Sequence, residues 1–108
     1  MAMQTITVHD LKQKQENGES FFLLDVRDYH EYLVSNIDGY HIPYEELENR
    51  LDEISEHTES ELIVMCRSGN TSMDACKKLK EKGFNNVISL QGGMMRWAKE
   101  IDPSLPFM

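Results

Sequence analysis

The sequence lacks any long apolar segment. No run approaches the roughly 18 consecutive apolar residues of a membrane-spanning helix. The start, Met1-Ala2-Met3-Gln4-Thr5, lacks the basic and apolar regions of a signal peptide. Repeats, low-complexity tracts and linker-like segments are absent as well. We therefore expect a soluble cytoplasmic protein without membrane contact, whose residues 1–108 form a single domain.

Cysteine is also scarce. The chain has two cysteines, Cys66 and Cys76, which is too few for a disulfide framework, and neither belongs to a paired metal-ligand spacing. We expect both to be reduced, and we expect no metal or cofactor. Metal-ligand spacing is equally absent among the four histidines, which we expect mostly in solvent on helices or loops: His9, His30, His41 and His57.

The net charge of −8 argues against nucleic acid or an anionic membrane as a partner, because both would be repelled. Residues 1–60 carry 14 acidic and 4 basic side chains, whereas residues 61–108 carry 5 acidic and 7 basic ones. The half with both cysteines is thus slightly positive, which would suit an anionic substrate. The alternative, that these charges merely cover solvated helix faces, stays open.

Three short apolar runs predict strands that are buried on both faces: residues 21–26, 62–65 and 87–90. Helical patterns separate them and begin at Thr7, at Asp28, after Pro43, at Thr71 and behind Gly92-Gly93. The pattern over residues 71–82 places Cys76 on its apolar face, and Gly83 is suited to cap its end. Strands that alternate with helices favour an α/β fold with a mostly parallel sheet.

Cys66 directly follows one of these strands, residues 62–65, and a short polar loop leads from it into the next helix. Functional groups of parallel sheets gather at such strand ends. Backbone N–H groups of a loop can converge on one point, and the helix N-terminus adds partial positive charge there. Arg67 adds a full positive charge. We therefore predict that Cys66 is a nucleophile in its thiolate form.

Several motifs follow one another along the chain. They are Leu24-Asp25-Val26-Arg27, Glu31-Tyr32, Ile42-Pro43, Cys66-Arg67-Ser68-Gly69-Asn70-Thr71-Ser72, Gly83-Phe84, and Leu90-Gln91-Gly92-Gly93 with Trp97. Their order and spacing resemble the rhodanese family over nearly the whole chain. The resemblance implies a rhodanese-like α/β fold, with a central, mostly parallel sheet of about five strands and helices on both faces.

The resemblance also implies sulfur transfer through Cys66. The thiolate would take sulfane sulfur from thiosulfate or another persulfide donor, and the persulfide would pass it to a thiophilic acceptor such as cyanide or a thiol. Family loops that begin with Cys-Arg and end in Thr resemble those of thiosulfate sulfurtransferases, which favours thiosulfate. The implied substrate-binding residues are those of the loop: Arg67, Ser68, Gly69, Asn70, Thr71 and Ser72.

Three further features have roles that the motif alone does not give. Asn36 stands where the family usually has histidine, and we expect that position to serve packing and hydrogen bonding. Asp25 and Arg27 could be catalytic, but a carboxylate and a guanidinium at a strand end more often orient neighbouring loops. Cys76 could resolve an oxidised Cys66 as a disulfide, but its place on an apolar helix face favours a packing role.

The sequence also bears on three other functions. A phosphatase or arsenate reductase would need an arginine six residues after Cys66, where this chain has Ser72. A catalytically inactive regulator would have lost the cysteine or its loop, and both are present. The main alternative is a persulfide carrier that delivers sulfur to a protein partner, because residues 97–103 resemble the end of rhodanese domains fused to adenylating enzymes.

Overall fold

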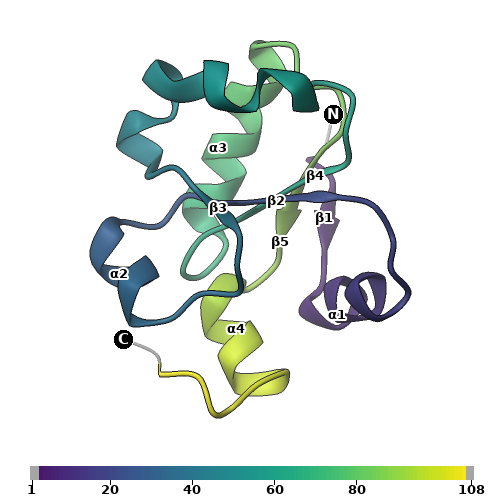
Figure 1. The fold of residues 1–108 in the computed structure, drawn as a ribbon, viewed down its shortest axis with the longest axis vertical. Helices are drawn as coiled ribbons and strands as arrows, with labels where there is room; N and C mark the ends of the chain where they lie inside the picture. The colour runs from purple at the N-terminus through teal and green to yellow at the C-terminus, as the bar shows by residue number, and fades with distance from the viewer. Residues whose placement is uncertain (1–2, 107–108) are drawn as a thin grey trace.

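The computed structural model describes residues 3–106 and shows a parallel sheet between layers of helices (Figure 1). The strands are Thr5–Ile6 (β1), Phe22–Asp25 (β2), Tyr40–His41 (β3), Leu62–Met65 (β4) and Val87–Leu90 (β5). They lie in the order β1-β5-β4-β2-β3, and every pairing is parallel. The expected α/β fold with about five strands is confirmed. Met1 and Ala2, part of the segment judged unlike a signal peptide, lie outside the described residues.

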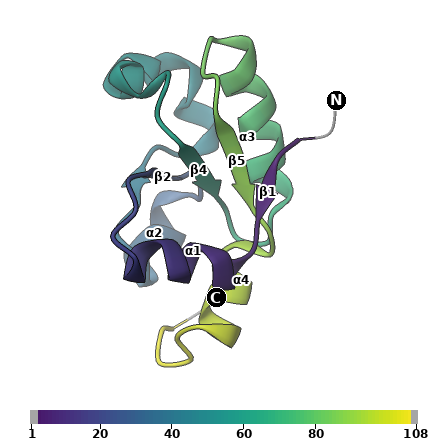
Figure 2. The same cartoon turned by 90° about the vertical axis from the view of Figure 1, so that its right-hand side faces the viewer.

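Helices cover both faces of the sheet, as expected (Figures 1 and 2). Their bounds are Val8–Glu16 (α1), Tyr29–Val34 (α2), Asn70–Glu81 (α3) and Gly93–Glu100 (α4), with 3₁₀ segments Tyr44–Glu46 (η1) and Glu48–His57 (η2). The 3₁₀ segments and α3 pack on one face, and α1 and α4 pack on the other. Within residues 3–106 we find no helix with the length and apolar character that crossing a membrane requires.

Strand β4 lies at the centre of both cores. Its four residues are fully buried, and side chains alternate between the two faces of a strand. Leu62 and Val64 accordingly join the core beneath α3, while Ile63 and Met65 join the core beneath α1 and α4. This two-sided burial explains why β4 reads in the sequence as an uninterrupted apolar run.

The helix ends follow the local sequence signals. Thr7 caps α1 by accepting a hydrogen bond from the backbone N–H of Asp10, and Asp28 forms a complete capping box with Glu31 at the start of α2. Beyond α3, Gly83 takes a left-handed φ of +97°. The next N–H, of Phe84, reaches back to the Leu79 carbonyl, which completes the predicted glycine cap.

The helix predicted after Pro43 is wrong in detail. The segment forms 3₁₀ turns, interrupted by non-helical backbone at Arg50 and Ile54. Long 3₁₀ runs are rare because their hydrogen bonds are poorly aligned, so breaks of this kind are expected within them. The breaks still allow Leu47 and Ile54 to be fully buried in the core beneath α3, which is why the apolar spacing looked helical.

A buried ion pair anchors the end of β2. The guanidinium of Arg27 donates to both carboxylate oxygens of Asp25, with Nη2 to Oδ2 at 2.8 Å, and both side chains are almost completely buried. The same guanidinium donates to the backbone carbonyls of Glu31 and Ser35. These contacts agree with the interpretation of Asp25 and Arg27 as residues that orient the segment around α2.

We predict that Arg27→Leu destabilises the fold by about 3–5 kcal/mol, because it leaves the Asp25 carboxylate buried without its cation. Chemical denaturation in urea measures the loss. The control is Arg50→Leu, which removes the more exposed pairs with Glu46 and Glu53 and should cost below about 1 kcal/mol for each pair. Equal small losses in both variants would contradict the anchoring role of Arg27.

Candidate active site

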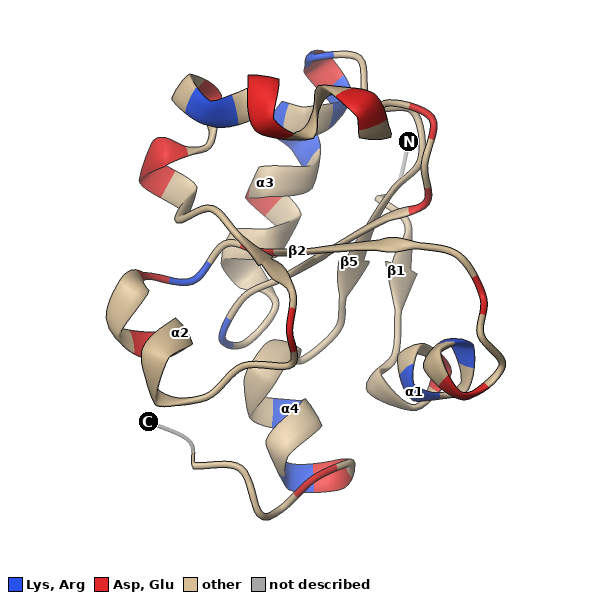
Figure 3. Ribbon diagram, viewed as in Figure 1, with Lys and Arg blue, Asp and Glu red and all other residues tan. Residues whose placement is uncertain are grey.

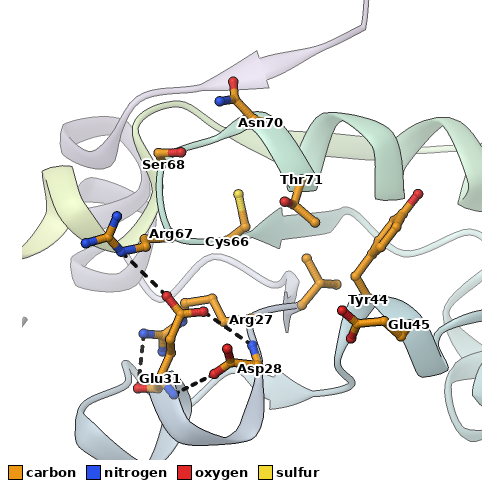
Figure 4. Close-up of a pocket in the computed structure, with 11 residues that line it drawn as sticks. Arg27, Asp28, Glu31, Tyr44, Glu45, Cys66, Arg67, Ser68, Asn70 and Thr71 are labelled. Carbon is orange, nitrogen blue, oxygen red and sulfur yellow. Dashed lines mark hydrogen bonds and ion pairs between the residues drawn. The ribbon is translucent and has the colours of Figure 1, made fainter. Parts of the chain in front are cut away.

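Cys66 follows the last residue of β4 and lies in a pocket of about 400 Å³ (Figure 4). The residue is 3% exposed and lines this pocket, which gives a reactant access to its thiol. The position agrees with the general rule that parallel sheets carry their functional groups at the carboxyl ends of strands.

Two backbone N–H groups point at the sulfur. The N–H of Gly69 donates to Cys66 Sγ at 3.1 Å, and the N–H of Ser72 donates to it at 3.2 Å. Ser72 lies in the first turn of α3, where N–H groups have no carbonyl partner within the helix. The helix N-terminus therefore directs partial positive charge toward the sulfur.

The predicted binding residues divide into two groups. Arg67, Ser68, Asn70 and Thr71 line the pocket together with Cys66. Gly69 and Ser72 instead act through their backbone N–H groups, and the Ser72 side chain faces inward: it is fully buried, and its hydroxyl bonds to the Gly69 carbonyl and the Ser89 hydroxyl.

The way in which α4 holds the cysteine loop, residues 66–72, was not predicted from the sequence. The N–H groups of Met94 and Met95 donate to the carbonyls of Cys66 and Arg67, each at 2.9 Å. Gly93 makes this approach possible, because a Cβ there would lie 2.2 Å from the Cys66 carbonyl oxygen. The Gly92-Gly93 pair after β5 was the available signal, since adjacent glycines often mark close contact between backbones.

Acidic side chains from the first half of the chain complete the pocket. Asp28, Glu31 and Glu45 lie across from the loop in Figure 4, and Figure 3 shows the acidic stretches along η1 and η2. On the loop itself, the half-exposed Arg67 places its Nε 3.6 Å from Glu31 Oε2. The slightly positive charge of residues 61–108 is therefore an incomplete guide to the pocket.

Cys76 has the properties of a packing residue. It is fully buried on α3, and this burial, together with the charge of Cys66, raises the pKa of its thiol to about 12. The side chain stays protonated near neutral pH, where a protonated thiol is a poor nucleophile and a poor partner for disulfide exchange. This agrees with the packing role favoured by the sequence.

Two of the four histidines are less solvated than expected, whereas His9 and His30 are exposed as expected. His41 stacks on Tyr32 with ring centroids 4.3 Å apart, and its Nε2 lies 2.7 Å from the Arg27 carbonyl. His57 stacks on Phe22 at 3.9 Å. Both rings are half-buried because each packs on an aromatic side chain, which their sequence positions could not reveal.

Asn36 has the expected hydrogen-bonding role. Its amide nitrogen donates to the Tyr32 carbonyl at 3.1 Å, and its amide oxygen accepts from the Asp38 N–H at 2.9 Å. Asp38 itself adopts a left-handed φ of +64°. Asn36 therefore fixes the turn between α2 and β3.

No group of three His, Cys, Asp or Glu side chains within residues 3–106 is placed to hold a metal ion.

The fold and the site define an α/β protein with one cysteine cradled by backbone amides at the edge of a parallel sheet. The rhodanese-like domain family matches residues 7–100, and the chain belongs to this family. The structure is also similar to that of SSP1007 from Staphylococcus saprophyticus, with a TM-score of 0.81 and 26% identity over 92% of this chain and 97% of that one.

Curated relatives carry names from sulfur metabolism. YtwF from Bacillus subtilis, named as a proposed sulfurtransferase, is 35% identical over 95% of this chain and 98% of its own length. YrkF from the same organism, named as a proposed sulfur carrier protein, is 39% identical over 85% of this chain and 49% of its own length. The adenylyltransferase and sulfurtransferase MOCS3-2 from Zea mays is 36% identical over 94% of this chain, which spans only 22% of that protein.

We predict that Gly93→Ala costs about 2–4 kcal/mol, because the new Cβ would collide with the backbone of Cys66 and Arg67. Urea denaturation measures the cost, which should come with slower alkylation of Cys66 as the loop shifts. Gly18→Ala is the control, because both glycines have a left-handed φ, +54° at Gly93 and +67° at Gly18. No atom lies within 4 Å of the Cβ position of Gly18, so about 1 kcal/mol is expected there. Equal losses at the two glycines would show that the contact is unimportant.

Proposed function

We propose that the chain is a sulfurtransferase in which Cys66 carries the transferred sulfur as a persulfide. The observation that supports this most directly is the pair of N–H groups, from Gly69 and Ser72, that donate to Cys66 Sγ inside a pocket. Donors arranged in this way stabilise the thiolate before transfer and can hold the terminal sulfur afterwards. The sulfurtransferase names among the relatives agree with this chemistry.

The reaction consists of two displacements. In the first, the Cys66 thiolate attacks the outer sulfur of thiosulfate or another persulfide donor; the Sγ–S bond forms, and the donor's S–S bond breaks to release sulfite or a thiolate. In the second, cyanide or an acceptor thiolate attacks the terminal sulfur, and Cys66 leaves as a thiolate. One neutral sulfur atom moves in each step, so no external oxidant or reductant is needed.

The residues around Cys66 take their roles from their positions. Arg67, Ser68, Asn70 and Thr71 line the pocket, where they can contact the donor. Arg67 supplies a cation for the sulfonate of thiosulfate, the donor that the sequence favours. Gly69 and Ser72 contribute their N–H groups.

A phosphatase is poorly supported by this geometry. Phosphoryl transfer needs a cation beside the equatorial oxygens of the phosphoryl group. The position six residues after Cys66 holds the buried Ser72, whose hydroxyl bonds to Gly69 and Ser89. Arg27 also lines the pocket, but Asp25 already engages its guanidinium.

A persulfide carrier that serves a protein partner is the second candidate. Its support is the sulfur carrier name of YrkF and the place of similar domains within larger adenylyltransferase and sulfurtransferase proteins. Carrier and enzyme use the same Cys66 persulfide and differ in whether small molecules complete the cycle.

We also infer that residues 1–108 act as one domain and that it works in the cytoplasm. One of the two cores runs from Ile6 to Leu105 along the chain, which favours a single folding unit. Both cysteines are free thiols, as is usual in a reducing compartment.

Incubation with thiosulfate should add one sulfur atom to the wild-type protein and none to Cys66→Ser, because only the cradled thiolate can attack the donor. Intact mass spectrometry measures the addition. Cys76→Ala is the matched control, since it removes the other thiol and should gain sulfur as the wild type does. Sulfur uptake by Cys66→Ser, or none by the wild type with any sulfane donor, would refute the proposal.

With thiosulfate and cyanide together, the proposed enzyme should form thiocyanate over many turnovers, because the persulfide is open to a small acceptor through the pocket. Colorimetric detection of thiocyanate measures this turnover. If each protein molecule is loaded once and releases no sulfur to cyanide, the carrier function is favoured instead.

A further inference from the structure

The pocket around Cys66 has more acidic than basic side chains, although its loop contains Arg67. We propose that the acidic wall formed by Asp28, Glu31 and Glu45 makes the site select sulfur acceptors by charge. Thiols with a positive group near their sulfur then react faster than matched anionic thiols. The proposal rests on the function proposed above and specifies its substrate class.

The two basic side chains at the pocket are both engaged with carboxylates. Arg27 is buried, and its guanidinium donates to both oxygens of Asp25, which offsets its charge. Arg67 is half-exposed, with its Nε 3.6 Å from Glu31 Oε2. Arg27 therefore presents no uncompensated charge to an incoming molecule, and Glu31 offsets part of the charge of Arg67.

Asp28 and Glu45 add negative charge beyond these pairs. The Asp28 carboxylate accepts the N–H of Glu31 at 2.8 Å, so the start of α2 keeps this charge fixed at the pocket. Glu45 is exposed at the start of η1, and within residues 3–106 no basic side chain forms an ion pair with it. Its negative charge faces the pocket from the side opposite the cysteine loop (Figure 4).

The field of these carboxylates acts on whatever approaches the sulfur. An acceptor must bring its thiolate into the pocket. Asp28 and Glu45 then repel a second negative charge on the same molecule and attract a positive group. The backbone amides of Gly69 and Ser72, which hold the terminal sulfur, do not distinguish acceptors by their second charge, because backbone dipoles act only over short distances. Discrimination between acceptors therefore comes from the carboxylates.

The test uses protein whose Cys66 has been loaded with sulfur from inorganic polysulfide and freed of excess reagent. Cysteamine, 2-mercaptoethanol and 3-mercaptopropionate, which are thiols of similar size but different charge, are then added separately. Intact mass spectrometry follows the loss of the extra sulfur atom. Rates are compared for the wild type, for Glu45→Gln and for the control Glu16→Gln. Glu16 is an exposed residue of α1, which packs on the other face of the sheet, so the control makes the same charge change away from the pocket.

We expect the ratio of the cysteamine rate to the mercaptopropionate rate to fall about fivefold in Glu45→Gln and to stay unchanged in Glu16→Gln. The intrinsic reactivity of each thiol is the same with all three proteins, so the change in the ratio isolates the charge. Salt should shrink the wild-type ratio, because the carboxylate field is screened. The peptides Lys-Cys-Lys and Glu-Cys-Glu repeat the comparison: a preference in both pairs extends the class to basic protein segments, and one in the small thiols alone limits it to aminothiols.

An unchanged ratio in Glu45→Gln, or an equal fall in Glu16→Gln, would overturn the charge selection and leave the sulfur transfer intact. Failure of Cys66 to take up sulfur from polysulfide is a different result, since it would overturn the proposed function itself and this inference with it.

Discussion

The close contact between Gly93 and the backbone of Cys66 is the constraint on which the site depends. The first turn of α4 donates to the carbonyls of Cys66 and Arg67, and these hydrogen bonds hold both carbonyls toward α4. The loop can then turn its own N–H groups, from Gly69 and Ser72, toward the sulfur. Any side chain at position 93 would separate α4 from the loop, so the amide cradle exists because two backbone segments meet without a Cβ between them.

The site is held in place from two further directions. Ser72 links it to β5 through the hydroxyl of Ser89 at 2.7 Å. On the other side, the pair between Asp25 and Arg27 fixes the end of β2 and ties it to the carbonyls around α2. The central strands of the sheet thus position the loop and the opposite pocket wall independently. Because of this rigid support, the N–H donors of Gly69 and Ser72 already point at the sulfur, which lowers the free energy of reorganisation during the proposed transfer.

The parts that the sequence predicts are those with strong local signals. The strands β4 and β5 are apolar runs bounded by polar residues, and Cys66 stands at a strand end before a glycine-containing loop. The two-residue strands β1 and β3 have no comparable pattern, because pairing with their neighbours alone makes them strands. The 3₁₀ turns after Pro43 bury the same apolar spacing that a helix would, so periodicity could not distinguish them. Stacking of His41 and His57 likewise depends on contacts distant in sequence.

The charge of the pocket was beyond prediction for the same reason. Counting charges by halves of the chain assigns a positive character to the half with Cys66, but parallel pairing of β2 with β4 sets Asp28 and Glu31 beside the cysteine loop, and η1 adds Glu45. The proposed sulfur chemistry depends on a loop whose motif is local, whereas the wall opposite the loop comes from a distant segment. Chains that share the loop could therefore share the proposed persulfide step and still differ in their partners, because the residues of the opposite wall vary independently of the loop.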